Sequence, residues 1–109
     1  MSLRIRLKGT GTVTLAAQGT VDAERTLAKE ASRALPGSVV DVREIRRMDE
    51  EPRIVEDFAL TYILTTEVEV ESADEKSART AAFRTARRAL EGTRFARVAW
   101  EPKVSIVRA

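Results

Sequence analysis

Basic side chains gather on one face of the segment that follows Ser72, and they are the residues of this sequence best suited to bind a ligand. Alanine and larger apolar residues recur there at helical spacing from Ala78 to Leu90, which predicts an amphipathic helix with the basic residues on its opposite face. This face and the residues that follow it contain Lys76, Arg84, Arg87, Arg88, Arg94 and Arg97. Such a surface can lie along a phosphate backbone or meet the acidic groups of a partner protein, and otherwise it is simply solvated.

Acid–base and nucleophilic chemistry have few candidates in this chain. Its 109 residues include no histidine and no cysteine, which excludes disulfides, thiolate chemistry, the usual zinc sites and the commonest general base. We therefore expect neither a catalytic site nor a cofactor.

Carboxylates cluster between two of the predicted strands. They are Asp49, Glu50, Glu51, Glu56 and Asp57. Oxygen ligands of this kind bind divalent cations, but nothing in the sequence would bury them, and arginines flank them on both sides. We interpret the segment as a solvated hairpin tip and expect no metal site, although the sequence alone leaves a cation there open.

Gly9 and Gly11 resemble part of a phosphate loop only superficially. They lie in the middle of a predicted strand, with threonines between and after them and no helix following directly, so a nucleotide-binding fingerprint is not indicated. Glycine in a strand more often leaves room for a neighbour. We expect Trp100 to lie opposite Gly9 and Val98 to lie opposite Gly11.

Six elements are predicted to position these side chains, without a linker, a repeat or a low-complexity segment. Apolar and polar residues alternate over 3–15, which predicts a long half-buried strand. A helix capped by Thr20 is expected over 21–35, and a capping box from Ser72 to Glu75 is expected to open the second helix, which ends near Gly92. The remaining strands are expected at 40–47, 58–70 and 95–107.

The order strand, helix, strand, strand, helix, strand predicts one α+β domain over residues 1–109. Right-handed crossovers place such an order in a four-stranded antiparallel sheet, with spatial order 4-1-3-2 and both helices on one face. This arrangement resembles the ferredoxin-like βαββαβ sandwich. The resemblance is one of architecture and implies no particular function.

Charge and hydropathy predict how the first and third strands pair. Ile5 is expected opposite Val70 and Leu7 opposite Val68, a register that also places the first strand's basic residues against glutamates. The expected charge pairs are Arg4 with Glu71, Arg6 with Glu69, and Lys8 with Glu67. The N-terminal basic run therefore has a structural explanation, and a phosphate-binding strip is the alternative.

The third strand is expected to extend beyond the start of the second. This leaves an open edge where another chain can associate. This expected partner-binding edge consists of Thr65, Thr66, Glu67, Val68, Glu69, Val70 and Glu71. The strands are also longer than the helices that cover them. Val68, Val70, Val104 and Ile106 are therefore expected to stay partly bare unless another chain covers them.

Two functions remain, with an enzyme as a distant third. We favour a non-catalytic assembly or partner-binding module that self-associates, either through this edge or through the open face of the sheet. The open face is expected to carry a band made of Thr10, Thr12, Thr14, Thr61, Ile63 and Thr65. The alternative is a nucleic-acid-binding module that uses the second helix.

An enzyme would be similar to the small dimeric α+β barrels, with Tyr62, Trp100 and Arg79 lining a cavity between sheet and helices. The sequence contains no leader pattern and no apolar run long enough to span a membrane. A cytoplasmic protein without membrane contact is therefore expected.

Overall fold

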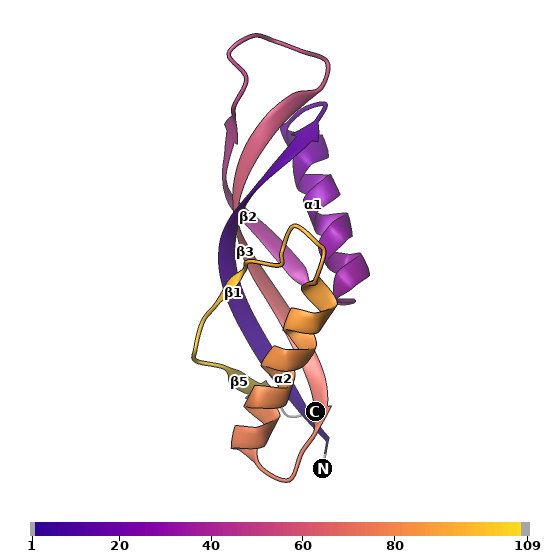
Figure 1. Cartoon of the computed structure of the whole chain (residues 1–109), viewed down its shortest axis with the longest axis vertical. Coiled ribbons are helices and arrows are strands. Elements are labelled where there is room, and N and C mark those ends of the chain that lie inside the picture. Colours follow the sequence, from indigo (N-terminus) through magenta and orange to yellow (C-terminus); the bar gives the residue numbers. More distant parts are fainter. Residues whose placement is uncertain (1, 108–109) are drawn as a thin grey trace.

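The computed structural model describes residues 2–107. Along the chain, its elements are β1 (Ser2–Ala17), α1 (Thr20–Ala34), β2 (Val39–Arg47), β3 (Glu56–Glu71), α2 (Glu75–Leu90), β4 (Ala99–Trp100) and β5 (Ser105–Val107). The protein is thus an α+β protein with an antiparallel sheet and two helices (Figure 1).

The sheet differs from the expected one in its last part. Its order is β2-β3-β1-β4, and β5 also pairs with β1, so two short strands replace the continuous strand expected over 95–107. The register moves between them, from Gly9 against Trp100 to Ile5 against Ile106. Pro102 lies in the segment between β4 and β5. Proline has no N–H to donate to a ladder, which accounts for the interruption.

The pairing of β1 with β3 is shifted by two residues from the expected register. Ile5 lies opposite Val68, not Val70, and Leu7 lies opposite Thr66, not Val68. A shift of two keeps every side chain on its expected face, so a pattern of period two cannot distinguish the two registers. The charge pairs move as well, and Lys8 now lies opposite Thr65.

Both helices cover the same face of the sheet, one beyond the other along the long axis of the molecule (Figure 1). β1 and β3 have 16 residues each, or about 53 Å of strand. The helices have 15 and 16 residues, or about 23 Å each, so that together they nearly match this length. The molecule is accordingly elongated, with extents of 56 × 23 × 21 Å.

This arrangement overturns the expectation of a partly bare inner face for Val68 and Val70, but not for Val104 and Ile106. Val68 is 6% exposed and Val70 8% exposed, because α2 covers this end of the sheet. Val104 and Ile106, on the edge segment, are partly buried against the same cluster. The chain thus covers the β3 part of its own apolar face, so Val68 and Val70 give no reason for association.

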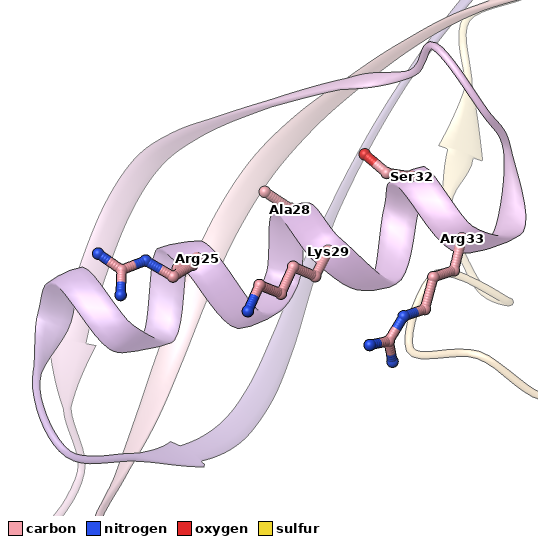
Figure 2. Close-up of a pocket in the computed structure, with 5 residues that line it drawn as sticks. All are labelled: Arg25, Ala28, Lys29, Ser32 and Arg33. Carbon is pink, nitrogen blue, oxygen red and sulfur yellow. The ribbon is translucent and has the colours of Figure 1, made fainter.

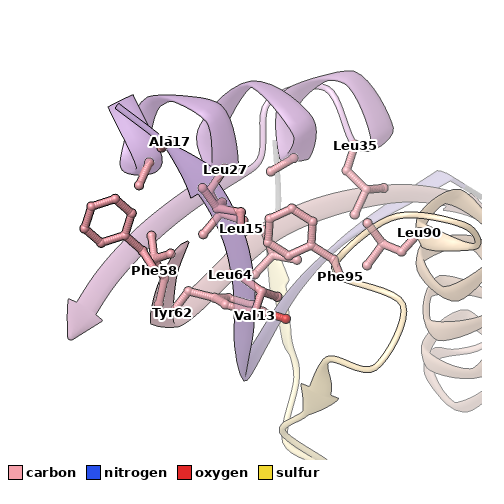
Figure 3. Packing of buried hydrophobic residues seen from close by; sticks show 13 residues of the cluster. Val13, Leu15, Ala17, Leu27, Leu35, Phe58, Tyr62, Leu64, Leu90 and Phe95 are labelled. Atoms are coloured by element: carbon pink, nitrogen blue, oxygen red, sulfur yellow. The ribbon is translucent and has the colours of Figure 1, made fainter. Parts of the chain in front are cut away.

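The core consists of two clusters, one under each helix. The first lies between α1 and the halves of β1 and β3 that contain Leu15 and Leu60 (Figure 3). The second lies between α2 and the opposite halves, which contain Ile5 and Val68. Trp100 is packed against both clusters and joins them.

Candidate functional surfaces

The edge of β3 is open where it was expected to be, starting one residue later. Pairing with β2 ends at Val39 opposite Thr65. Among residues 2–107, no strand pairs with 66–71 on the side away from β1. The physical cause is the short β2, which can begin only after the loop that ends α1.

Backbone groups on this edge point outward at odd-numbered positions. The backbone N–H of Glu101 donates to the Lys8 carbonyl at 2.8 Å, so Lys8 directs its backbone away from β3. In an antiparallel pair its partner Thr65 then directs its own backbone away from β1. The hydrogen bond from Met48 N–H to the Asp57 carbonyl, 2.8 Å, gives the same direction at another odd-numbered residue of β3. Glu67 and Glu69 therefore present backbone donors and acceptors to the open side.

The side chains of this edge divide between the two faces. Thr66, Val68 and Val70 are buried under α2, and their backbone groups point to β1, so they offer a partner no free hydrogen-bonding group. Glu67, Glu69 and Glu71 are exposed on the open face of the sheet. Glu67 accepts hydrogen bonds from Arg6 Nη2 at 2.9 Å and Nε at 3.3 Å, which confirms a structural role for part of the N-terminal basic run.

The open face of the sheet carries an uncharged band on β1 and β3, which extends to single residues at the start of β2 and on β4. Asp41, Glu44 and Arg46 of β2 border it, opposite Ile63, Thr61 and Ala59. The band consists of Thr10, Thr12, Thr14 and Ala16 on β1, Ala59, Thr61, Ile63 and Thr65 on β3, Val39 on β2 and Ala99 on β4. Val39 is 62% exposed. The hydroxyls of Thr12 and Thr61 lie 3.3 Å apart in a cross-strand pair. They border a shallow depression of about 170 Å³ that Glu44 and Arg46 close on the β2 side. No helix covers this band in the described part of the chain.

The basic face predicted for α2 is present and points away from the sheet. Its four helical members, Lys76, Arg84, Arg87 and Arg88, are all exposed. Two shallow depressions, of about 510 and 270 Å³, follow this side of the helix and share Thr80 and Arg84. The guanidinium carbon of Arg87 lies 5.9 Å from the centre of the Phe83 ring, within range of a cation–π contact.

The two predicted basic residues beyond α2 have different environments. Arg94 donates from its backbone N–H and from Nη1 to the two carboxylate oxygens of Glu30, at 3.0 and 2.8 Å. It therefore ties the loop after α2 to α1 and is committed to a structural contact. Arg97 is exposed in the same loop.

A second basic stripe on α1 was missed from the sequence. Arg25, Lys29 and Arg33 lie four residues apart on the side opposite the buried Ala23 and Leu27. Together with Ala28 and Ser32 they line a depression of about 460 Å³ (Figure 2). The signal was their spacing, since residues four apart share one side of a helix. It was overlooked because α1 also carries acidic residues and has no net basic charge.

Some of these arginines also have a structural role, because they lie at the C-terminal ends of the helices. The C-terminal ends of α1 and α2 lie near one another in the middle of the helix layer, where Leu90 and Phe95 join the cluster under α1 (Figures 1 and 3). Arg33 lies in the last turn of α1, and Arg87 and Arg88 lie in the last turn of α2. Cations there offset the partial negative charge of a helix C-terminus.

The acidic residues after β2 accept hydrogen bonds from the backbone of their own loop. Asp49 accepts a hydrogen bond from the Asp57 backbone N–H at 2.8 Å. Glu56 accepts one from the Arg53 backbone N–H at 3.2 Å and lies 3.5 Å from Arg47 Nη1. Within residues 2–107, no group of three or more acidic side chains is placed to hold a metal ion.

The residues considered for a catalytic cavity are separated by packing. The Tyr62 ring meets Phe95 edge-on at 5.0 Å, and the Trp100 ring meets Phe83 edge-on at 6.4 Å. Burial raises the pKa of the Tyr62 hydroxyl. Arg79 is exposed on α2. The three side chains do not form a common site.

The central glycines leave space for rings, for Trp100 at Gly9 as expected and also for Tyr62 at Gly11. A Cβ at Gly9 would come within 2.6 Å of Val98 Cγ2 and 2.9 Å of Trp100 Cε3. A Cβ at Gly11 would come within 2.5 Å of the Tyr62 hydroxyl. Gly11 therefore accommodates Tyr62, its neighbour on β3. The pairing of β1 with β4 includes Gly9 with Trp100 and Thr10 with Ala99, so the expected position of Val98 opposite Gly11 lies one residue beyond it and stays a prediction.

Comparisons with protein-family models, with curated proteins and with solved structures gave no match to this chain. Neither α1 nor α2, the helices of the described residues, combines the length and the apolar character needed to cross a membrane.

Proposed function

We propose that the protein is a non-catalytic assembly module that self-associates through the open face of its sheet. The observation that carries the proposal is the uncharged band described above. A third of the chain is charged, yet no charged residue interrupts this band on β1 or β3 from residue 10 to 16 and from 59 to 65, and the charged Asp41, Glu44 and Arg46 of β2 lie only along its border. Flat sheet faces that lack charge at their centre favour contact with another sheet.

The open face suits contact between copies better than the β3 edge does. When two copies of one edge pair antiparallel, directly opposite residues share a face, so odd-numbered residues meet odd-numbered residues. Every register confined to 66–71 then brings at least one glutamate against a glutamate. Like charges directly opposite one another destabilise a strand pair.

The test is the absolute mass in solution, measured by light scattering on a sizing column at low and at high salt. The proposal expects a defined oligomer that survives high salt, because apolar and hydroxyl contacts are weakly screened. Ile63→Lys, at the centre of the band, should yield the monomer. Ser32→Lys, on the outer side of α1, is the control that adds the same charge elsewhere and should leave the mass unchanged. A wild-type monomer at every concentration and salt would contradict the proposal.

Nucleic-acid binding is the second candidate, and the basic stripes on both helices favour it. Arg25, Lys29 and Arg33 on α1 and the basic face of α2 all point away from the sheet on the same side of the molecule. A polyanion could therefore contact both helices at once.

The test for this candidate is the affinity for single-stranded and duplex DNA as salt is varied. Arg84→Glu combined with Arg88→Glu should abolish binding, and Arg43→Glu combined with Arg53→Glu is the control with the same change in charge. A flat salt dependence, or equal losses in both double variants, would count against this function.

Three predictions from the sequence accompany the proposal. The architecture is interpreted as a ferredoxin-like sandwich whose fourth strand is divided into β4 and β5. The location is proposed to be cytoplasmic, and the protein is proposed to lack an enzymatic activity because it has no histidine or cysteine.

A further inference from the structure

The open edge of β3 has the features of a docking site for an added strand. Residues 66–71 have no strand on the side away from β1 in the described part of the chain, and they span about 20 Å. Glu67 and Glu69 direct backbone donors and acceptors to that side, as the hydrogen bonds at Lys8 and Asp57 establish. Main-chain bonds of this kind supply the affinity when a sheet gains a strand.

Charge restricts which strand can be added. The glutamates at 67, 69 and 71 are on one face, at alternate positions. The side chains of an added strand alternate in the same way, so the residues directly opposite these glutamates also point to the open face. Lysine or arginine there forms favourable cross-strand pairs, whereas acidic residues are repelled.

The other face of the added strand would extend the inner layer. Its side chains would lie beside Thr66, Val68 and Val70, which are 2, 6 and 8% exposed. A partner residue at these positions therefore continues an apolar surface. We propose that the edge of β3 at 66–71 binds an extended segment of another protein in which basic residues alternate with apolar ones.

The chain itself contains an example of this pairing. On the other side of β3, the N-terminal part of β1 has the sequence Leu-Arg-Ile-Arg-Leu-Lys from Leu3 to Lys8. Its Arg6 pairs with Glu67 at 2.9 Å, and its Ile5 and Leu7 are fully buried. The proposed partner repeats this pattern on the free side. The proposal does not depend on self-association, because the edge is available in a monomer and in a dimer formed through the open face.

The experiment uses the full-length protein and a soluble peptide in which arginine alternates with valine. The control peptide has the same composition, with the arginines in one block and the valines in another. Binding is measured by fluorescence anisotropy, and the backbone amide resonances of the protein are followed by NMR. We expect the alternating peptide to bind at least about tenfold more tightly, because only alternation matches the spacing of the glutamates. The largest shifts are expected at 66–71.

Two variants at position 69 separate the contribution of the backbone hydrogen bond from that of the side-chain charge. Glu69→Pro removes a backbone N–H that points away from β1, so the pairing of β1 with β3 is kept. Glu69→Gln keeps that N–H and removes the charge. We expect Glu69→Pro to lose at least about tenfold in affinity at every salt concentration, and Glu69→Gln to lose a few-fold at low salt only.

Each alternative result overturns the proposal. Equal affinity for the two peptides would show attraction by net charge alone. Amide shifts confined to the helix layer or the open face would place the site elsewhere. Unchanged binding by a folded Glu69→Pro would exclude strand addition, and the amide shifts of the wild type decide the matter should that variant not fold. Absence of binding by either peptide at low salt would mean that the glutamates only guard the edge.

Discussion

Thr66 is a polar residue in an otherwise apolar inner face. It is 2% exposed, and its hydroxyl has no hydrogen-bond partner among the described residues. It lies on β3 between the two core clusters, opposite Leu7. A buried hydroxyl without a partner loses its hydration and gains nothing in return.

Replacing this hydroxyl with a methyl group should stabilise the protein. We expect Thr66→Val to raise the free energy of unfolding by about 1 kcal/mol, because the shape is kept and the unpaired polar group is removed. Urea unfolding followed by circular dichroism measures the change. Thr65→Val, on the open face of the same strand, is the control and should change stability by less than about 0.5 kcal/mol. Destabilisation by Thr66→Val would show that the hydroxyl has a partner, such as a buried water.

Gly11 is required by the ring packed against it. Tyr62 is 1% exposed and is held by its edge-on contact with Phe95. The Cβ of Gly11→Ala would lie 2.5 Å from the Tyr62 hydroxyl, so we expect a loss of about 1–3 kcal/mol in unfolding free energy. Adding Tyr62→Phe to Gly11→Ala should recover part of that loss, because the nearest atom is removed. A double-mutant cycle from urea unfolding tests this, and strict additivity would disprove the contact.

At the scale of single elements, the start of α2 depends on Asp74. Its carboxylate accepts hydrogen bonds from the Ser77 backbone N–H at 2.8 Å and from the Ser77 hydroxyl at 3.2 Å. Asp74 is therefore the N-cap, and the expected capping box between Ser72 and Glu75 is wrong. The Ser72 hydroxyl instead donates to the Asp74 carbonyl at 2.9 Å. These hydrogen bonds from Ser77, the backbone one first, hold the pKa of Asp74 below its ordinary value.

The contribution of this cap should depend on pH. Because the folded pKa is lowered, the stabilisation is present above the unfolded pKa and is lost as pH falls through the folded value. We expect Asp74→Ala to lower the unfolding midpoint by about 5 °C at pH 7. The difference from wild type should shrink as the pH falls below about 4. Thermal scans from pH 7 to pH 2.5 measure it, and Asp74→Asn is the control that keeps a cap without a titrating group. A difference that stays constant over this range would contradict the assignment.

The sequence predicts the helices and strands of this fold better than it predicts which residues of neighbouring strands lie opposite one another. Period-two alternation assigns each residue of β1 and β3 to a face, but it is blind to a shift of two. No tight hairpin joins these two strands to set their register. The placement of Trp100 opposite Gly9 was predicted correctly because it rests on size, since only a glycine leaves room for the ring. The division of β4 from β5 was missed, although Pro102 was a visible signal.

The features of the candidate surfaces that depend on local periodicity or length were also predictable from the sequence, whereas contacts between distant segments were not. The exposure of Arg84 and Arg88 follows from helical period and was predictable. The salt bridge from Arg94 to Glu30 was not, because it joins segments 64 residues apart. The open edge after Thr65 was predictable from strand lengths, and its first residue was misjudged because it depends on the register of β2 with β3.

At the scale of the whole molecule, the two helices lie over different halves of one long sheet. The radius of gyration is 15.7 Å, whereas a compact chain of this length has about 13 Å. Between the two clusters, the inward-facing positions of β1 and β3 include Gly9, Gly11 and Thr66, which supply little apolar surface. Trp100 fills this gap and contacts both clusters. The indole is thus an apolar connection between the halves, in addition to Leu90 of α2, which belongs to the cluster under α1, and to the backbone pairing of β1 with β3.

The cooperativity of unfolding should therefore depend on Trp100. The cluster under α2 contains three alanines and no aromatic ring among its fully packed members, so it buries less apolar area and is the weaker half. We expect Trp100→Ala to lower the free energy of unfolding by about 3 kcal/mol and to let the half under α2 unfold separately. Amide exchange at Ile5, Leu7 and Val68 should then become faster than at Val13 and Leu60.

Amide hydrogen exchange followed by NMR separates this outcome from a uniform loss of stability. In the wild type, the core amides of both halves should exchange with similar protection, because Trp100 links their opening. Trp100→Phe keeps a ring against Gly9 and should preserve that equality, with a smaller loss of stability. Equal loss of protection in both halves of Trp100→Ala would contradict the role of the indole as a connection. It would mean that the continuous backbone pairing of β1 with β3 is enough to make the elongated sheet unfold as one unit.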